Sequence, residues 1–190
     1  MGAIETAGKS LGLPTQAYLV AGDGRLMDAQ VEMESGMSAV LGALAGINMI
    51  SGAGMLDFLA SQSIEKLVID AEAIASAQRL IEGIEPRTAS LAIEMFEQTG
   101  LQGDFLKLKE TRALFRQEQH FPSDVVDRGP TGRGDASRGI LERAERRVEE
   151  LLACFERKNL PPECEAELIA YAQWEGRKAG FEGLPEILHS

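Results

Sequence analysis

Two short apolar runs in the chain each end in a pair of glycines and are followed by an aspartate. The first run, TQAYLVAG at 15–22, leads into the loop DGRLMD at 23–28, and the second, INMIS at 47–51, leads into GAGMLD. Residues 28–46 lie between the runs and have apolar residues at helical spacing, with Gly46 placed as a stop. Strand–helix–strand units with such short connections predict a parallel sheet covered by helices.

The rest of the chain has a predominantly helical pattern. Residues 63–83 repeat apolar residues at helical spacing, with Ser61 or Ser63 as the expected cap and Gly83 as the end. The segment 104–119 predicts an extended piece and then a short helix, and 121–137, rich in glycine, proline and charge, predicts a loop. Further helices are expected at residues 2–12, 88–98, 137–158 and 161–176.

Only two convincing strands are found in 190 residues. Two parallel strands cannot bury both faces of a stable sheet by themselves, because parallel sheets are covered on both sides. The pattern therefore predicts that the chain is part of a larger α/β structure.

The charge balance restricts the classes of ligand. The formal net charge is −11 and the pI is near 4.7, which argues against nucleic acid and anionic membrane surfaces as partners. An acidic surface suits a cationic ligand, although it also serves solubility alone. No apolar run is long enough to span a bilayer, and MGAIETAGKS does not have the pattern of a signal peptide. The spacing of Cys154 and Cys164 fits no metal motif, so no metal site is expected, and a reducing cytoplasm is the expected location.

The carboxyl ends of the two predicted strands form the candidate site, because ligands of parallel α/β units bind there. The residues concerned are Gly22, Gly24 and Asp28 after the first strand, and Gly52, Gly54 and Asp57 after the second. Two interpretations stay open. Either the glycines let a ligand approach the backbone and the aspartates hold a cation, or the glycines make tight turns and Asp28 caps a helix. The other helix carboxylates are expected to form solvated faces; they are Glu32, Glu34, Glu65, Asp70 and Glu72.

Several segments, in collinear order, resemble the C-terminal part of the trimethylamine methyltransferase family, which also includes glycine betaine:corrinoid methyltransferases. The matching segments are LP…AG…DAQ at 13–30, GINMISGAGMLD at 46–57, SIEKLVIDAE at 63–72, GDFL with ET…FR at 103–116, DR at 127–128 and ERAERRVEELL at 142–152. The resemblance implies the C-terminal portion of a (β/α)8 TIM barrel, helix-rich, with C-terminal helices. The expected division is a partial barrel at 1–121, a loop at 122–136 and C-terminal helices at 137–190. Gln30 stands where the family usually has a lysine-like residue.

The resemblance also implies an activity. Enzymes of this family move a methyl group from a methylated amine, such as trimethylamine or glycine betaine, to the Co(I) of a corrinoid carried on a separate small protein. No cofactor is then bound directly by this chain. Its expected partners are the corrinoid protein, the amine, and either a second copy or the missing N-terminal half of the barrel. The candidate substrate-binding residues are Asp28, Gln30, Gly52, Gly54 and Asp57.

Two alternatives remain beside this interpretation. The chain could be a non-catalytic remnant or an interaction module derived from such a barrel. It could also be an unrelated helical regulator, which requires the predicted strands at 15–22 and 47–51 to be absent.

Overall fold

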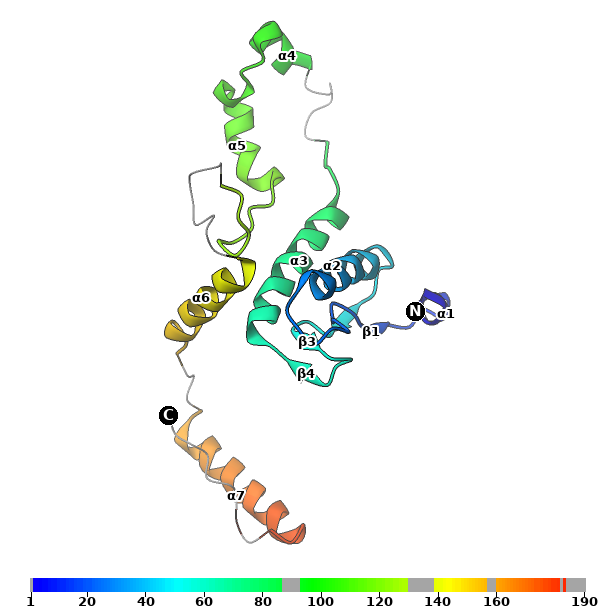
Figure 1. Ribbon diagram of the computed structural model, residues 1–190, viewed down its shortest axis with the longest axis vertical. Helices are drawn as coiled ribbons and strands as arrows, with labels where there is room; N and C mark the ends of the chain where they lie inside the picture. Colours follow the sequence, from blue (N-terminus) through cyan, green and yellow to red (C-terminus); the bar gives the residue numbers. More distant parts are fainter. Residues whose placement is uncertain (1, 87–92, 130–138, 157–159, 182, 184–190) are drawn as a thin grey trace. The chain divides into compact units, whose positions relative to one another are not determined.

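The computed structural model describes residues 2–86, 93–129, 139–156, 160–181 and 183 (Figure 1). They form two compact units, which divide after Leu152. The first unit contains the strands and the second contains the last helix. The domain boundaries expected at residues 121 and 136 stay a prediction, because residues 130–138 lie outside the described ones.

A parallel pair of strands lies at the centre of the first unit. β1 (Gln16–Tyr18) pairs with β2 (Met49–Ser51) in parallel, with Gln16 opposite Met49, and α2 (Ala29–Leu44) connects them. The predicted strand–helix–strand unit is therefore confirmed. β1 ends earlier than predicted because the backbone turns away at Val20, which has φ +62°. β2 ends at Ser51 as predicted but begins at Met49, two residues later than predicted.

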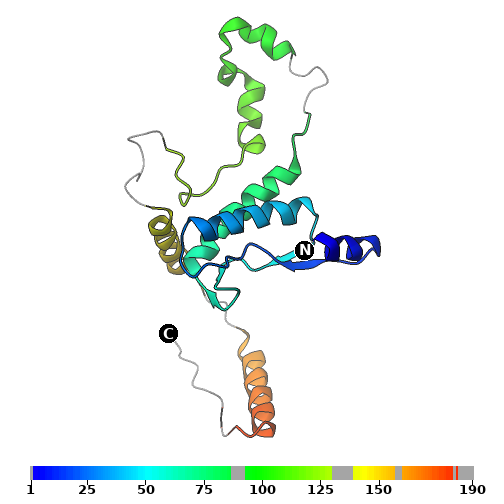
Figure 2. The ribbon, with the colours of Figure 1, turned by 45° about the vertical axis from the view of Figure 1, so that its right-hand side comes forward.

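Two helices pack on each other and cover the strand pair. α3 (Ile64–Glu82) lies beside α2, and α2 runs along the strands (Figures 1 and 2). Both helices begin at the predicted caps: Asp28 accepts hydrogen bonds from backbone N–H groups of α2, and Ser63 accepts one from Lys66. The buried core between strands and helices consists of Ala17, Leu19, Val20, Ala39 and Ala77.

A β-hairpin connects β2 to α3, and the sequence pattern did not indicate it. β3 (Met55–Leu56) and β4 (Ser61–Gln62) pair antiparallel. The loop between them has three consecutive non-glycine residues with positive φ: Asp57 at +51°, Phe58 at +51° and Leu59 at +71°. Strands of two residues are too short to show an alternation of apolar and polar residues, so the sequence predicted only a glycine turn here.

The remaining elements are mostly helical. They are α1 (Gly2–Ser10), α4 (Ile93–Thr99), η1 (Gly100–Gln102), η2 (Phe105–Lys107), α5 (Lys109–Glu118), α6 (Ile140–Ala153) and α7 (Pro162–Lys178). The extended piece predicted before α5 is wrong, since η2 is a 3-10 turn that ends at Lys107. In the first unit, Ala144 of α6 packs with Ile69 and Val125 in a second small core.

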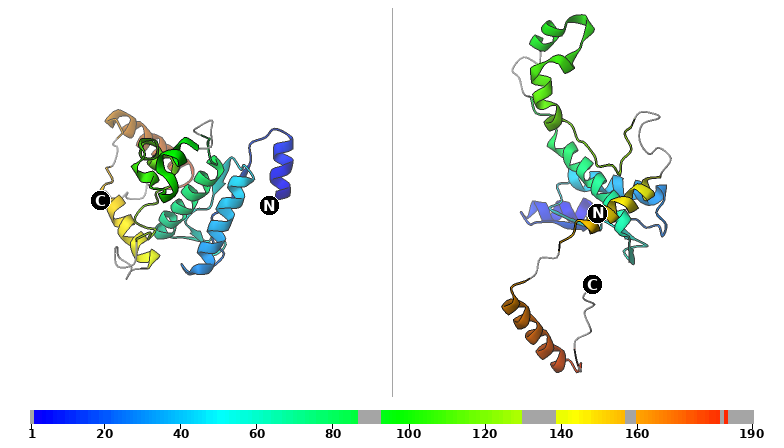
Figure 3. Two further views of the ribbon diagram at one scale, coloured as in Figure 1. Left: turned by 90° about the horizontal axis from the view of Figure 1, so that it is seen from above. Right: turned by 90° about the vertical axis from the view of Figure 1, so that its left-hand side faces the viewer.

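The described residues do not form a closed barrel. Their strands make two separate two-stranded sheets, β1–β2 and β3–β4. The views in Figure 3 show α2 and α3 side by side from a second direction. Among the described helices, none is long and apolar enough to cross a membrane.

Candidate functional site

The two glycine-containing segments that follow β1 and β2 contact each other at the carboxyl ends of the parallel strands. The Gly22 N–H donates to the Met55 carbonyl at 2.9 Å, and the Asp57 N–H donates to the Gly24 carbonyl at 3.0 Å. These bonds fix the two strand ends side by side. We call residues 20–28 and 52–60 the strand-end loops.

Both glycines of the second loop are required by geometry. Gly52 has φ +148°, and a Cβ atom there would lie 2.5 Å from the Leu19 carbonyl oxygen. Gly54 has φ +82°, and its Cβ would lie 3.0 Å from Leu67 Cβ and 3.2 Å from the Ser63 carbonyl oxygen. The bare backbone thus accommodates the chain's own packing, which agrees with the tight-turn interpretation.

The first loop ends in a helix cap. Asp28 Oδ1 accepts hydrogen bonds from the N–H of Gln30 at 3.0 Å and of Val31 at 3.4 Å. The Gln30 side chain donates to Glu34 Oε1 at 2.9 Å. Asp28 therefore stabilises the N-terminus of α2, and its charge faces the positive end of the helix dipole.

Asp57 is paired with a cation of the same chain. Its Oδ1 accepts from Arg25 Nε at 3.1 Å, with side-chain exposures of 35% for Asp57 and 84% for Arg25. Such an exposed ion pair contributes little to stability. A cationic ligand at Asp57 would therefore compete with Arg25 for the carboxylate.

Beneath the loops lies a buried ion pair that the sequence reasoning missed. Lys66 Nζ lies 2.5 Å from Asp70 Oδ2, and both side chains are fully buried. Lys66 Nζ also donates to Ser35 Oγ of α2 at 2.7 Å. Asp70 Oδ2 accepts the backbone N–H of Gly54 at 2.7 Å. The ion pair therefore joins α3 to α2 and to the second strand-end loop.

The expectation that Asp70 belongs to a solvated face is wrong. A Lys–Asp pair four residues apart resembles an ordinary surface pair on a helix. The signal that identifies it is its position: Lys66 and Asp70 lie on the buried face of α3 together with Ile69 and Ala77. That spacing places the two charges within the apolar stripe.

Val20 begins the first strand-end loop in a strained conformation. Its φ is +62°, although it is β-branched, and it is fully buried. Its N–H donates to Ser38 Oγ of α2 at 2.9 Å, and its carbonyl lies 3.5 Å from Lys66 Nζ of α3. A left-handed valine persists only where the surrounding structure holds it, and here both helices do so.

A second carboxylate lies near the ion pair. Burial raises the pKa of Glu32, the nearby Asp70 raises it further, and Lys66 acts in the opposite direction. Glu32 Oε1 and Asp70 Oδ1 are buried, and neither has a hydrogen-bond partner among the described residues. The Lys66 and Asp70 side chains are closed to solvent, and their contacts are with the backbone of the strand-end loops and with Ser35.

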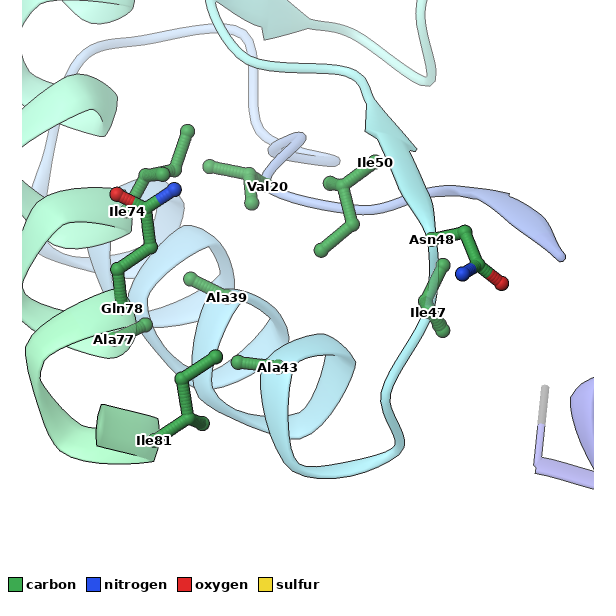
Figure 4. A pocket seen from close by; sticks show the side chains of 10 residues that line it. All are labelled: Val20, Ala39, Ala43, Ile47, Asn48, Ile50, Ile74, Ala77, Gln78 and Ile81. Carbon is green, nitrogen blue, oxygen red and sulfur yellow. The ribbon is translucent and has the colours of Figure 1, made fainter. Parts of the chain in front are cut away.

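A separate apolar cavity of about 270 Å³ lies between α2, α3 and β2 (Figure 4). Its lining residues are Val20, Ala39, Ala43, Ile47, Asn48, Ile50, Ile74, Ala77, Gln78 and Ile81. The side-chain oxygen of Asn48 is already occupied by the N–H of Thr15 at 3.0 Å. With no charged residue in this lining, the cavity offers nothing that would hold an ammonium group. Among the described residues, no cluster of His, Cys, Asp and Glu is arranged for a metal ion.

Comparison with known proteins gives one family. The family model described as trimethylamine methyltransferase (MTTB) matches residues 3–180. Trimethylamine methyltransferase MttB2 of Methanosarcina mazei is 34% identical over 145 residues, which are 74% of this chain and 28% of that protein. MttB1 of the same organism is 36% identical over 119 residues, 62% of this chain and 23% of the relative. Glycine betaine methyltransferase of Desulfitobacterium hafniense is 28% identical over 173 residues, 90% of this chain and 36% of the relative.

The chain thus spans about a quarter to a third of the length of the curated relatives it matches. The predicted resemblance is confirmed by a family match that covers nearly the whole sequence and by a relative above 30% identity over 74% of it. The chain belongs to the trimethylamine methyltransferase family.

Proposed function

We propose that the chain forms the strand-end part of a methyltransferase that takes a methyl group from a methylated amine, such as trimethylamine or glycine betaine. The acceptor in this proposal is the cobalt of a corrinoid carried by a separate protein. The observation that carries the proposal is the family match over residues 3–180, combined with a parallel β1–α2–β2–α3 unit whose two strand-end loops adjoin. Ligands of parallel α/β units bind at such strand ends.

The fold proposed for the complete catalytic domain is a (β/α)8 barrel, of which this chain supplies the last strands and the C-terminal helices. In the described residues β2 pairs only with β1, so its other edge is open to a further strand. In this proposal, side chains of such a strand would pack into the apolar cavity that β2, α2 and α3 line. A missing N-terminal part of the domain, or a second copy of this chain, would provide that strand.

In this proposal the strand-end loops bind the amine. A methylated ammonium is a cation, and Asp57 is the candidate carboxylate that combines an exposed position with a weak partner, Arg25. Asp28 caps α2, and the Gln30 side chain is hydrogen-bonded to Glu34, so we assign both residues a supporting role. Gly52 and Gly54 shape the loop that carries Asp57.

The described strand-end loops contain aspartate, arginine and apolar residues, and no histidine or cysteine. In this proposal the corrinoid is bound and presented by another protein. When bound, the corrinoid would supply the nucleophile and accept the methyl group, and the electron pair of the broken C–N bond would stay with the amine. The chain's own residues would orient the ammonium and compensate its charge.

The test is a calorimetric titration of the chain with trimethylamine and with glycine betaine. It is carried out first on the chain alone and then on its complex with a polypeptide that carries the remaining part of a family member's catalytic domain. Binding in the complex supports the proposal. A stable complex that binds neither amine contradicts it.

One observation favours the alternative, a non-catalytic remnant or interaction module. Asp28 and Asp57, the two predicted ligands for a cation, both have partners inside the chain. If the complex forms and no amine binds, this alternative is the one that stands.

A further inference from the structure

A continuous series of contacts connects the two strand-end loops through side chains of α3 that lie beneath them. It starts at the Val20 carbonyl in the first loop, which lies 3.5 Å from Lys66 Nζ. It continues from Lys66 to Asp70 Oδ2 at 2.5 Å, and from Asp70 Oδ2 to the Gly54 N–H in the second loop at 2.7 Å. Two side chains of a single helix, α3, thereby connect both loops.

Both backbone ends of this series have positive φ. Val20 has φ +62° and Gly54 has φ +82°. Glycine adopts such a φ without strain, but a valine persists there only where its surroundings hold it. Ser35 accepts a hydrogen bond from Lys66, and Ser38 accepts one from the Val20 N–H, so α2 contributes to the same arrangement.

The ion pair is a poor device for stability alone. Removing two charges from water costs free energy that their attraction does not always return, and apolar replacement of a buried pair is often neutral or stabilising. Apolar side chains cannot make directional hydrogen bonds. Lys66 offers a donor to the Val20 carbonyl, and Asp70 offers an acceptor to the Gly54 N–H. The distinctive contribution of Lys66 and Asp70 is therefore to loop conformation.

We propose that Lys66 and Asp70 are positioning residues for the strand-end site. They touch no ligand, because both side chains are fully buried. They fix the distance and orientation between the loop that begins at Val20 and the loop that carries Asp57. This inference rests on the proposed function as far as the ligand is concerned, and on the contacts above as far as the loops are concerned.

The experiment compares three variants of the full chain, each also studied in complex with the remaining part of the family domain. Lys66→Met/Asp70→Leu removes the charges and keeps apolar bulk. Lys66→Met/Asp70→Asn also removes both charges but keeps an acceptor oxygen for the Gly54 N–H, so that no buried charge is left unpaired. Asp104→Asn/Lys107→Met removes an exposed pair three residues apart, at 2.9 Å, and serves as the control. Three quantities are measured: the melting temperature, the hydrogen exchange rate of the Gly54 amide by NMR, and the affinity for trimethylamine and glycine betaine.

In the Lys66→Met/Asp70→Leu variant we expect a melting temperature equal to or above that of the unmodified chain, together with Gly54 exchange that is faster by about tenfold or more, the equivalent of one lost hydrogen bond. Amine affinity should fall by a similar factor. Lys66→Met/Asp70→Asn should restore most of the Gly54 protection and most of the affinity, and the control should change neither. A purely structural role predicts the opposite pattern, with altered melting and unaltered affinity.

A Lys66→Met/Asp70→Leu variant that melts normally with unchanged Gly54 exchange overturns the proposal. So does one that loses Gly54 protection and still binds the amine as the unmodified complex does. If the unmodified complex binds no amine, the proposed function fails, and the Gly54 exchange rate still decides whether Lys66 and Asp70 position the loop. A Lys66→Met/Asp70→Leu variant that does not fold contradicts the inference that the pair is dispensable for stability.

Discussion

Asp70 Oδ2 lies 2.7 Å from the backbone nitrogen of Gly54, and both residues are buried. A side chain of α3 thus holds the glycine turn that follows β2. The turn is therefore a structural part of the candidate site, and its glycines are expected to tolerate no side chain.

The first prediction concerns Gly52. Gly52→Ala places a Cβ atom 2.5 Å from the Leu19 carbonyl oxygen in a backbone conformation with φ +148°. We expect the free energy of unfolding to fall by about 1–3 kcal/mol, the usual cost of a strained backbone residue. Urea denaturation measures the change.

Gly36→Ala is the matched control for this prediction. Gly36 lies within α2, and a Cβ there meets no atom within 4 Å. Alanine should stabilise the helix by roughly 0.5–1 kcal/mol. Equal effects of the two substitutions would show that the Gly52 turn is not constrained as described.

The second prediction separates the two possible roles of Asp28. Asp28→Ala removes the cap of α2 and should cost about 1 kcal/mol of stability. Asp28→Ser keeps a capping oxygen and should recover most of that loss. If Asp28 also holds the amine through its charge, then Asp28→Ser will melt normally and bind the amine more weakly. Calorimetric titration of the two variants distinguishes a cap alone from a cap that is also a ligand.

The third prediction concerns competition at Asp57. Arg25→Gln removes the internal cation from an exposed pair, so its effect on stability should be below about 1 kcal/mol. It should strengthen amine binding, because Asp57 no longer has to release Arg25. Asp57→Asn should weaken amine binding by about tenfold with little change in melting. Amine affinity that is indifferent to both substitutions would remove Asp57 from the site.

The fourth prediction concerns pH. The pKa of Glu32 is raised in the folded chain from an ordinary value of 4.5, first by burial and then by Asp70. Between 4.5 and the raised value the folded state binds more protons than the unfolded state, so Glu32 makes stability decrease as pH rises through this range. Glu32→Gln should remove this contribution and raise stability at neutral pH. The measurement is urea denaturation from pH 4 to 8, with the exposed Glu149→Gln as control. If the unmodified chain, Glu32→Gln and Glu149→Gln all show the same pH dependence of stability, Glu32 does not have a raised pKa in the folded chain.

Much of the fold could be predicted from the sequence because its signals are local. Apolar spacing indicated α2 and α3, and Asp28, Ser63 and Gly83 marked their ends correctly. The parallel pairing of β1 and β2 followed from the helix between them. That topology also indicated that both strand-end loops lie at the carboxyl ends of the strands, and the structure adds that they contact each other.

What could not be predicted depends on contacts between distant residues. The β3–β4 hairpin has strands of two residues, too short for any periodic signal. The left-handed Val20 is imposed by Ser38 and Lys66, which lie 18 and 46 residues away. The spacing within α3 puts Lys66 and Asp70 on the face of Ile69 and Ala77, but their partners Ser35, Val20 and Gly54 lie on other elements and could not be predicted from that spacing.

The most direct test of the central claim uses a chimera. In the glycine betaine methyltransferase of Desulfitobacterium hafniense, the region that aligns with this chain over 173 residues is replaced by this chain. Transfer of the methyl group from glycine betaine or trimethylamine to a Co(I) corrinoid protein is then followed by the absorbance of the corrinoid. Our account predicts methyl transfer that depends on the amine and is reduced about tenfold by Asp57→Asn. A chimera that melts cooperatively, binds the corrinoid protein and transfers no methyl group from either amine would contradict it.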